Sequence, residues 1–107
     1  MKLAPMLIAA VAAGPAFAQS ASDPGDPDAG GKFAQEICSD CHIVANGQAE
    51  PGRIDAPTFF EIASDPSTTA FSLRAYLRTP HYAMPNIILS PTETDNVVSY
   101  ILSLKGQ

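Results

Sequence analysis

The feature that most constrains this chain is the pentapeptide Cys38-Ser39-Asp40-Cys41-His42, which holds both cysteines of its 107 residues. Two thiols three residues apart at a helix end can reach two adjacent vinyl groups on one edge of a porphyrin and form two thioether bonds. The histidine that follows is then placed beneath the iron. The C-x-x-C-H spacing therefore predicts one covalently attached c-type haem, tethered through Cys38 and Cys41, with His42 as an iron ligand.

Three competing roles for these cysteines have to be weighed against haem attachment. A thioredoxin-like redox pair needs a βαβ setting, which the sequence does not show, and it leaves His42 without a role. A structural zinc site needs four ligands, and the chain offers only Cys38, Cys41, His42 and His81 as conventional ones. A disulfide between the two cysteines would close a very short loop and add little stability.

An iron held by one histidine has a sixth coordination position, and Met84 is the first candidate for it. This methionine lies in a proline-bounded loop, residues 80–86 (PHYAMPN), where core packing rarely places such a side chain. The alternative is a methionine that fills a gap beneath the last helix. His81 is the second candidate ligand, and a bis-histidine site would have a lower reduction potential.

Residues 1–18 have the organisation of an export signal. The basic Lys2 precedes an apolar stretch over residues 3–13, and a Gly-Pro pair and a small-x-small end, Ala16-Phe17-Ala18, follow. The stretch is too short to suit about 30 Å of hydrocarbon, so we expect cleavage rather than an uncleaved anchor. Export predicts a periplasmic location in a bacterium, outside the cytoplasm, where covalent haem attachment takes place.

The composition describes one small foldable domain. With 46% hydrophobic and 16% charged residues the chain can bury a core, although a domain of this size is near the lower limit for hydrophobic burial alone. The acidic, proline-containing residues 19–28 predict a flexible lead-in, which leaves residues 29–107 as the domain. A net charge of -5 argues against nucleic-acid binding, because neutralising phosphates needs clustered Lys and Arg.

The patterns predict an all-α domain of three to four short helices joined by long loops. Apolar residues at helical spacing predict a first helix from about residue 29 to 41, with Asp28 as N-cap. Residues 42–57 contain two prolines and two glycines, which indicates a loop that wraps around something. One or two helical turns are expected over residues 58–63.

Two further helices follow. The run Asp65-Pro66-Ser67-Thr68 predicts the start of a middle helix, and Pro80 should stop it. Ser90-Pro91-Thr92-Glu93 has the pattern of a capping box, and Gly106 should end the last helix. The expected core comprises Phe33, Ile37, Phe59, Phe60, Ile62, Phe71, Leu73, Tyr76, Leu77 and the apolar residues of 87–104.

From residue 28 to residue 106 the sequence resembles the small bacterial class I c-type cytochromes. Four segments match in family order: DAGGKFAQEICSDCH, DAPTFFEIA, AFSLRAYLRTPHYAMPN and TETDNVVSYILSLKG. The resemblance implies a cytochrome c fold around one covalently bound haem c, with Cys38 and Cys41 as thioether positions and His42 and Met84 as axial ligands. It also implies that the Pro57 carbonyl accepts a hydrogen bond from the ligand histidine, which would orient the ring.

The resemblance extends to the packing of the first and last helices. Gly30 and Tyr100 match the small and aromatic positions at which these helices cross. The sequence departs from the family at Ala34, where many relatives have an aromatic residue, and it has Phe33 one place earlier.

These features together predict a one-electron carrier and not an enzyme, because an iron with both axial positions filled has no place for substrate or dioxygen. The expected partners are transient redox proteins, such as a dehydrogenase, oxidase or reductase, that meet a monomer through a basic or apolar patch. One alternative is a peroxidase or gas sensor with a labile sixth ligand. Another is a small cytochrome subunit of a dehydrogenase or oxidase complex.

Overall fold

The structure is a computed structural model that describes residues 1, 3–5, 7–14, 25–51, 55–79 and 84–107. The described part of the chain is all-α, as predicted, and contains no strand. Its elements in chain order are α1 (Pro27–Ile37), the 3-10 helix η1 (Cys38–Asp40), α2 (Phe59–Ser64), α3 (Ala70–Arg78) and α4 (Pro91–Ser103). None of the helices in these ranges is long and apolar enough to cross a membrane.

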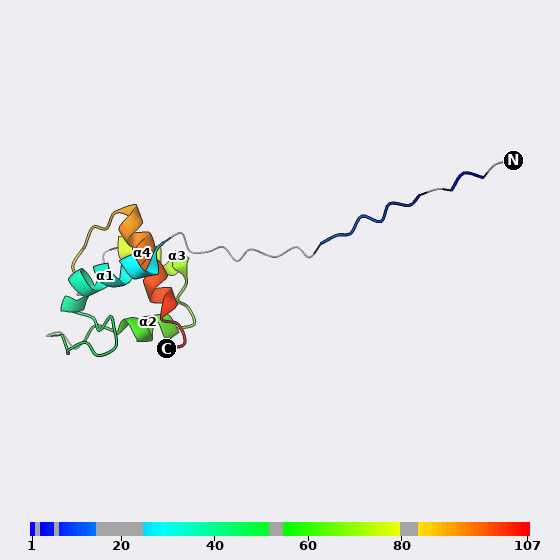
Figure 1. The fold of residues 1–107 in the computed structure, drawn as a ribbon. Helices are drawn as coiled ribbons and strands as arrows, with labels where there is room; N and C mark the ends of the chain where they lie inside the picture. Colours follow the sequence, from blue (N-terminus) through cyan, green and yellow to red (C-terminus); the bar gives the residue numbers. More distant parts are fainter. Residues whose placement is uncertain (2, 6, 15–24, 52–54, 80–83) are drawn as a thin grey trace.

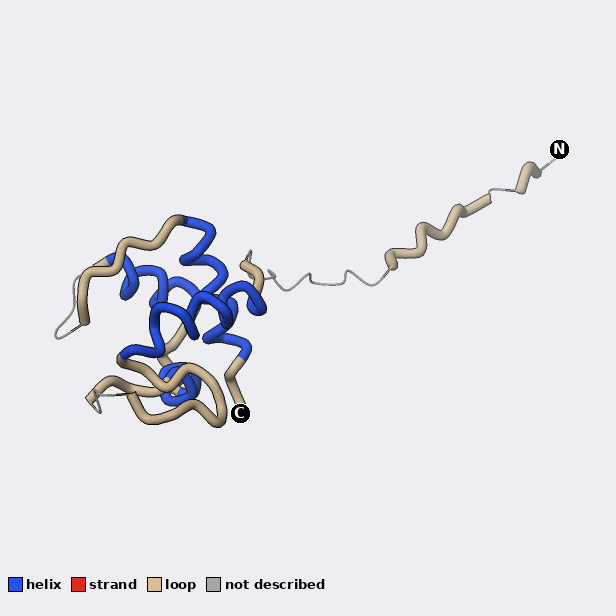
Figure 2. Tube along the Cα trace, turned by 60° about the vertical axis from the view of Figure 1, so that its left-hand side comes forward, coloured by secondary structure: helices blue, strands red, loops and turns tan. Residues whose placement is uncertain are grey.

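The helices pack around the crossing of α1 and α4 (Figure 1). The loop before α2 and the extended segment before α4 lie on opposite sides of this crossing, and both views show them as long irregular stretches on the outside of the domain (Figures 1 and 2). The described residues within 1–14 are exposed and have neither helix nor strand. The last positions of the expected leader, 15–18, and residues 19–24 of the expected lead-in lie outside the described ranges.

The first helix begins earlier than the sequence predicts. Asp26, not Asp28, is its N-cap, and the Asp26 carboxylate accepts hydrogen bonds from the backbone N–H groups of Asp28 at 2.9 Å and Ala29 at 3.4 Å. Pro27 follows at the first helical position, where its missing N–H costs nothing and its fixed φ suits the helix. Asp28 therefore lies in the first turn, where a carboxylate stabilises the helix through its dipole.

The start of the middle helix was also predicted wrongly. Asp65 is the C-cap of α2, and its carboxylate accepts hydrogen bonds from the backbone N–H and the hydroxyl of Ser67. This Asx turn fits an extended Asp65, because the residue before a proline is disfavoured in helical conformation. The helix α3 begins at Ala70, five residues after Asp65, and its capping box is formed by the N-cap Thr69 and Ser72.

The prediction for the last helix is confirmed. Ser90 and Glu93 form the capping box, with Pro91 at the first helical position. The helical segment gives way to a turn that ends at Gly106, whose φ of 85° lies in the left-handed region that glycine adopts without strain.

The crossing of α1 and α4 is a close backbone contact. A Cβ atom at Gly30 would lie 1.9 Å from the carbonyl oxygen of Asn96, and one at Gly31 would lie 3.0 Å from the Tyr100 ring. The helices meet where Gly30 and Tyr100 were predicted to meet. Ala34, one turn further along α1, is fully buried in this interface, and Phe33 packs against the core from its edge.

The buried core is smaller than the sequence indicates. Phe71, Tyr76 and Ile88 are 83%, 60% and 90% exposed, so their assignment to the core was wrong. Phe71 and Leu73 are two positions apart on a helix, which places them on opposite faces, and only the Leu73 face packs inward. Ile37, at the end of α1, is 40% exposed. The buried apolar residues are Ala34, Val44, Phe59, Ala63, Leu73, Val97, Val98, Ile101 and Leu104.

Candidate haem-attachment site

The pentapeptide forms a tight turn where α1 ends. Cys38 is the C-cap of α1, and its carbonyl oxygen accepts hydrogen bonds from the backbone N–H of Cys41 at 3.2 Å and of His42 at 2.9 Å. The 3-10 geometry of η1 thus brings both thiols and the histidine onto one turn of chain. Both cysteines are free thiols and half-buried.

Burial makes Cys38 a poor candidate for a reactive redox thiol, because it raises the pKa of the side chain. Loss of solvation raises the pKa of the Cys38 thiol to about 11, so at neutral pH the side chain is protonated. Redox-active C-x-x-C pairs depend on the opposite shift, a lowered pKa that exposes a thiolate. The environment of Cys38 therefore disfavours a thioredoxin-like role.

The imidazole of His42 has one orientation and one tautomer. Its Nδ1 lies 2.6 Å from the carbonyl oxygen of Pro57, and because a carbonyl only accepts, the proton is on Nδ1. The ring also packs at a tilt against Phe59, with 5.4 Å between centroids. Among the described residues none bonds to Nε2, which carries the lone pair that a metal requires. The contact that the resemblance implied for Pro57 is present.

The backbone that follows His42 is held by side chains further along the sequence. Gln48 Nε2 donates to the His42 carbonyl at 2.7 Å, and Gln48 Oε1 accepts from the Val44 N–H at 2.8 Å. The Phe59 N–H donates to the Ile43 carbonyl at 2.9 Å. Nothing in the sequence marked Gln48, which occupies a loop without a periodic pattern.

Tyr100 provides a second long-range contact to this loop. Its hydroxyl donates to the Val44 carbonyl at 2.5 Å, across 56 residues of sequence. Its ring lies 6.3 Å from that of Phe59, measured between centroids. The helix crossing and the histidine loop are therefore joined by one side chain, a connection that the family pattern for Tyr100 did not indicate.

The two candidates for the sixth position are described to different degrees. Met84 is partly buried at a bend that leads into the extended segment before α4. His81 lies outside the described residues. The segment that carries Met84 and the loop that follows η1 lie on opposite sides of the helix crossing (Figure 1).

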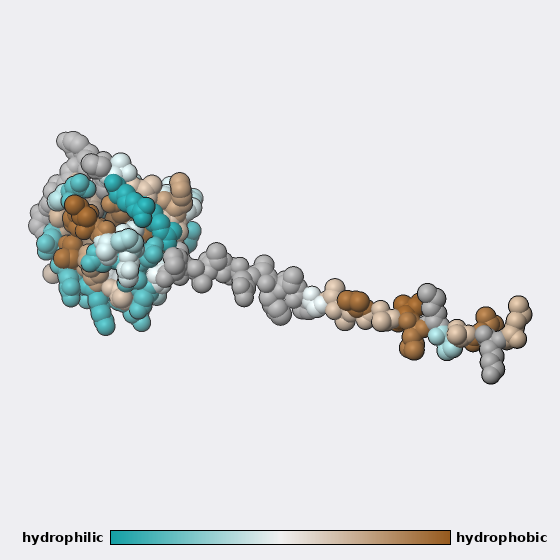
Figure 3. Space-filling view, turned by 90° about the horizontal axis from the view of Figure 1, so that it is seen from above, coloured by the Kyte–Doolittle hydropathy of each residue, from teal (hydrophilic) through white to brown (hydrophobic). Residues whose placement is uncertain are grey.

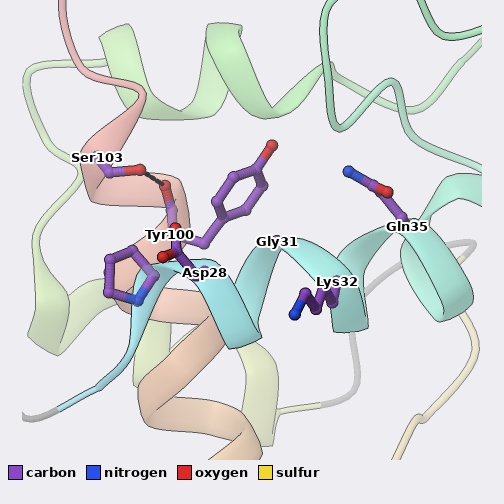
Figure 4. Close-up of a pocket in the computed structure, with 7 residues that line it drawn as sticks. Asp28, Gly31, Lys32, Gln35, Tyr100 and Ser103 are labelled. Atoms are coloured by element: carbon purple, nitrogen blue, oxygen red, sulfur yellow. Dashed lines mark hydrogen bonds between the residues drawn. The ribbon is translucent and has the colours of Figure 1, made fainter.

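Two hollows in the described part of the chain lie beside the helices. One is a polar hollow between α1 and α4, where Gly31 uncovers the ring of Tyr100 (Figure 4); it is lined by Pro27, Asp28, Gly31, Lys32, Gln35, Tyr100 and Ser103. The other lies between the end of α3 and the segment after Met84, and is lined mostly by apolar residues, including Leu77, Ile87 and Leu89. The polar hollow contains none of the residues predicted for the site.

Exposed apolar side chains are not spread evenly over the surface of the domain. Figure 3 shows apolar side chains gathered on part of the visible face and bordered by polar ones. Among the described residues of the domain, the large exposed apolar side chains include Ile37, Phe71, Tyr76 and Ile88. Ile37 directly precedes Cys38, so apolar surface adjoins the turn that carries the thiols.

The residues present fit a covalently attached haem. Cys38 and Cys41 are free thiols at the spacing that two vinyl groups require, and His42 offers an oriented Nε2. The second ring nitrogen is hydrogen-bonded to a backbone carbonyl, which is the arrangement usual for metal-binding histidines. Fold and donor set together define a monohaem protein of the c type.

Comparison with known proteins identifies the family. The chain is 37% identical over 99 residues to cytochrome c-552 of Bradyrhizobium diazoefficiens, a match that covers 92% of this chain and 90% of the relative. No protein-family model matches the chain, and no solved structure does. The chain belongs to the small class I c-type cytochromes. It is thus a haem-binding, iron-containing electron-transfer protein with covalently attached haem c.

Proposed function

We propose that this protein is a one-electron carrier in which Cys38 and Cys41 hold the haem and His42 and Met84 are its axial ligands. The observation that carries the proposal is the 2.6 Å contact between His42 Nδ1 and the Pro57 carbonyl, which directs Nε2 toward a metal. When bound, the haem supplies a ferric/ferrous couple, so the electron is stored without chemistry on the protein.

Each protein ligand has a separate effect on that couple. The Pro57 carbonyl accepts a hydrogen bond from the Nδ1–H group of His42, which makes the imidazole a stronger electron donor to iron. The thioether of Met84 favours the ferrous state, which raises the reduction potential relative to a bis-histidine site. The segment after Met84 and the loop after η1 lie on opposite sides of the helix crossing (Figures 1 and 2), which agrees with one iron ligand from each.

The proposed site accounts for a carrier and not an enzyme. With both axial positions filled, no substrate or dioxygen reaches the iron. Electrons then pass to redox proteins in short-lived encounters, and the net charge of -5 favours partners with a basic or apolar docking patch. The protein works as a monomer in the bacterial periplasm. Residues 1–18 are its cleaved leader. The lead-in expected over residues 19–28 is shorter, because the N-cap Asp26 and helix α1 from Pro27 already belong to the cytochrome domain.

The experiment that tests the carrier is the visible spectrum of the reduced, haem-loaded protein with and without carbon monoxide. A sharp low-spin spectrum that the gas leaves unchanged means that both axial positions are held. A clear shift on adding carbon monoxide would mean that the sixth position is open or labile, and the peroxidase or gas-sensor alternative would replace the carrier. Co-purification of the native protein with a dehydrogenase or oxidase would identify it as a subunit.

The variant Met84→Ala tests the sixth ligand directly. Loss of the thioether should lower the reduction potential and create carbon monoxide binding in the reduced protein. The matched control is Ile88→Ala, because Ile88 is in the same segment and 90% exposed, so its loss should alter neither property. If Met84→Ala behaves like the unmodified protein, another group such as His81 fills the position.

A further inference from the structure

Gln48 binds the backbone on both sides of Ile43. Its side-chain amide donates from Nε2 to the His42 carbonyl at 2.7 Å and accepts at Oε1 from the Val44 N–H at 2.8 Å. Both contacts are partly buried, where an amide that loses its partner is costly. One side chain thus fixes two of the peptide groups that follow the haem-binding cysteines.

The chain is shaped to bring Gln48 back to this position. Gly47 has a φ of 76°, a left-handed conformation that turns the chain, and the Gln48 N–H donates to the Ala45 carbonyl at 3.4 Å. The turn folds the loop over the residues it has just left. Gln48 therefore reaches His42 from a sequence distance of only six residues.

The hydrogen bonds around His42 link the loop before α2 back to the residue that follows the histidine. The imidazole donates to Pro57, the chain continues two residues to Phe59, and the Phe59 N–H donates to the Ile43 carbonyl at 2.9 Å. Gln48 fixes the peptides on either side of Ile43. Rotation of the His42 peptide would therefore move Nδ1 relative to the Pro57 carbonyl, and the Gln48 amide is the group that opposes this rotation.

We propose that Gln48 is a positioning residue for the axial histidine: its amide holds the His42 backbone so that Nδ1 stays bonded to Pro57 and Nε2 stays directed at the iron. This inference rests on the proposed role of His42 as a ligand. Gln48 touches neither iron nor haem in this role and acts only through His42.

Two substitutions of Gln48 separate the effect of its Nε2 donor from that of its Oε1 acceptor. Gln48→Glu keeps an oxygen that accepts from the Val44 N–H but removes the donor to the His42 carbonyl, whereas Gln48→Met keeps the length and removes both. The matched control is Gln107→Met, because Gln107 Nε2 also donates to a backbone carbonyl, that of Ser103, but at the exposed C-terminus.

The readout is the solvent exchange rate of the His42 Nδ1 proton, measured by NMR in the reduced haem-loaded protein. Both Gln48 variants should speed this exchange by about tenfold, the factor expected for losing one buried hydrogen bond, and the Gln107 variant should not. If the variants melt at lower temperature but Nδ1 exchange stays as slow as in the unmodified protein, Gln48 only stabilises the loop and does not position His42. The proposal is then wrong.

The same experiments keep this inference apart from the carrier proposal. The carrier proposal fails on the unmodified protein, if carbon monoxide binds. The Gln48 proposal is decided on the exchange rates, which report whether His42 is held whatever occupies the sixth position. Faster exchange in Gln48→Glu with normal stability is the outcome that supports it most directly, since the contact with the Val44 N–H is kept and the donor to the His42 carbonyl is lost.

Discussion

Tyr100 joins three parts of the molecule through one side chain. Its ring packs over Gly31 and against Phe59, and its hydroxyl donates to the Val44 carbonyl two residues after His42. An aromatic ring at a helix crossing needs only shape, but the hydroxyl adds a direct link from α4 to the histidine loop. The two contributions can be separated by substitution.

Tyr100→Phe should lower the free energy of unfolding by about 1 kcal/mol, because it removes one hydrogen bond and keeps the ring. Tyr100→Leu, which removes the ring as well, should cost more. Chemical denaturation monitored by circular dichroism measures both. Equal stability of Tyr100→Phe and the unmodified protein would show that the Val44 contact contributes nothing.

The same phenol gives a prediction for alkaline pH. Burial raises the pKa of Tyr100 above its ordinary value of 10.0. The unfolded chain therefore loses this proton at lower pH than the folded one, so stability is fully present below pH 10 and falls as pH rises through the folded value. The alkaline fall in melting temperature should be shallower in Tyr100→Phe. An unchanged slope would contradict a native-state shift.

The residues of the candidate haem site and the residue that supports His42 could be predicted from the sequence to different degrees, for physical reasons. Cys38, Cys41 and His42 follow a short spacing that only local geometry governs, so the sequence alone predicts them as the haem-binding residues. Gln48 is different, because its role depends on a turn at Gly47 and on which loop backbone groups lack partners. The turn and the positions of these backbone groups are defined only in the folded chain, so no sequence pattern indicates them.

The crossing of α1 and α4 depends on the absence of side-chain atoms on α1. Gly30 and Gly31 within α1 face α4, and so does Gly25 just before the N-cap, where a Cβ atom would lie 2.0 Å from the Asp95 carbonyl oxygen. The first helix accepts weak helix formers in its first turns because close approach to α4 needs them. The Asp26 N-cap and Pro27 offset part of that cost at the helix start.

Gly30→Ala should be strongly destabilising and Gly31→Ala only mildly so. At Gly30 the new methyl group meets the Asn96 backbone at 1.9 Å, which cannot give way, whereas at Gly31 it meets the edge of the Tyr100 ring at 3.0 Å. We expect a loss of about 3 kcal/mol for the first, at the upper end for overpacking, measured by denaturation. Gly47→Ala serves as control, because it adds only backbone strain in open space. Similar losses at 30 and 31 would contradict the close crossing.

Helix starts show where sequence reasoning succeeds and where it fails. The start of α4 was predicted because Ser90 and Glu93 form a capping box with a proline at the first helical position. The starts of α1 and α3 were misplaced because two residues could serve as N-cap at each start: Asp26 or Asp28 for α1, and Asp65 or Thr69 for α3. Capping propensity ranks such residues almost equally, and packing decides between them.

The domain as a whole has little buried apolar volume for its length. Among the described residues, two of the nine buried hydrophobic ones are alanines, and the largest completely buried side chains are valines. A chain of this size gains only a marginal hydrophobic core, so a large apolar ring held by two bonds adds a considerable share of the buried surface. The attached haem is therefore expected to be a structural element as well as the redox centre.

The double variant Cys38→Ala/Cys41→Ala tests this dependence on the whole molecule. It removes both tethers but keeps His42 and its bond to Pro57, so any haem must be held without covalent bonds. The melting temperature, followed by far-ultraviolet circular dichroism, should fall by at least about 10 °C, since 1 kcal/mol corresponds to roughly 4–8 °C for a domain of this size. The control Ser39→Ala changes one of the two residues between the cysteines and removes an exposed hydrogen bond to the Gln35 carbonyl, with an expected loss below about 1 kcal/mol. If the double variant has the same melting temperature as the unmodified protein, the apolar core is sufficient by itself. The thioether bonds would then serve only to retain the redox centre.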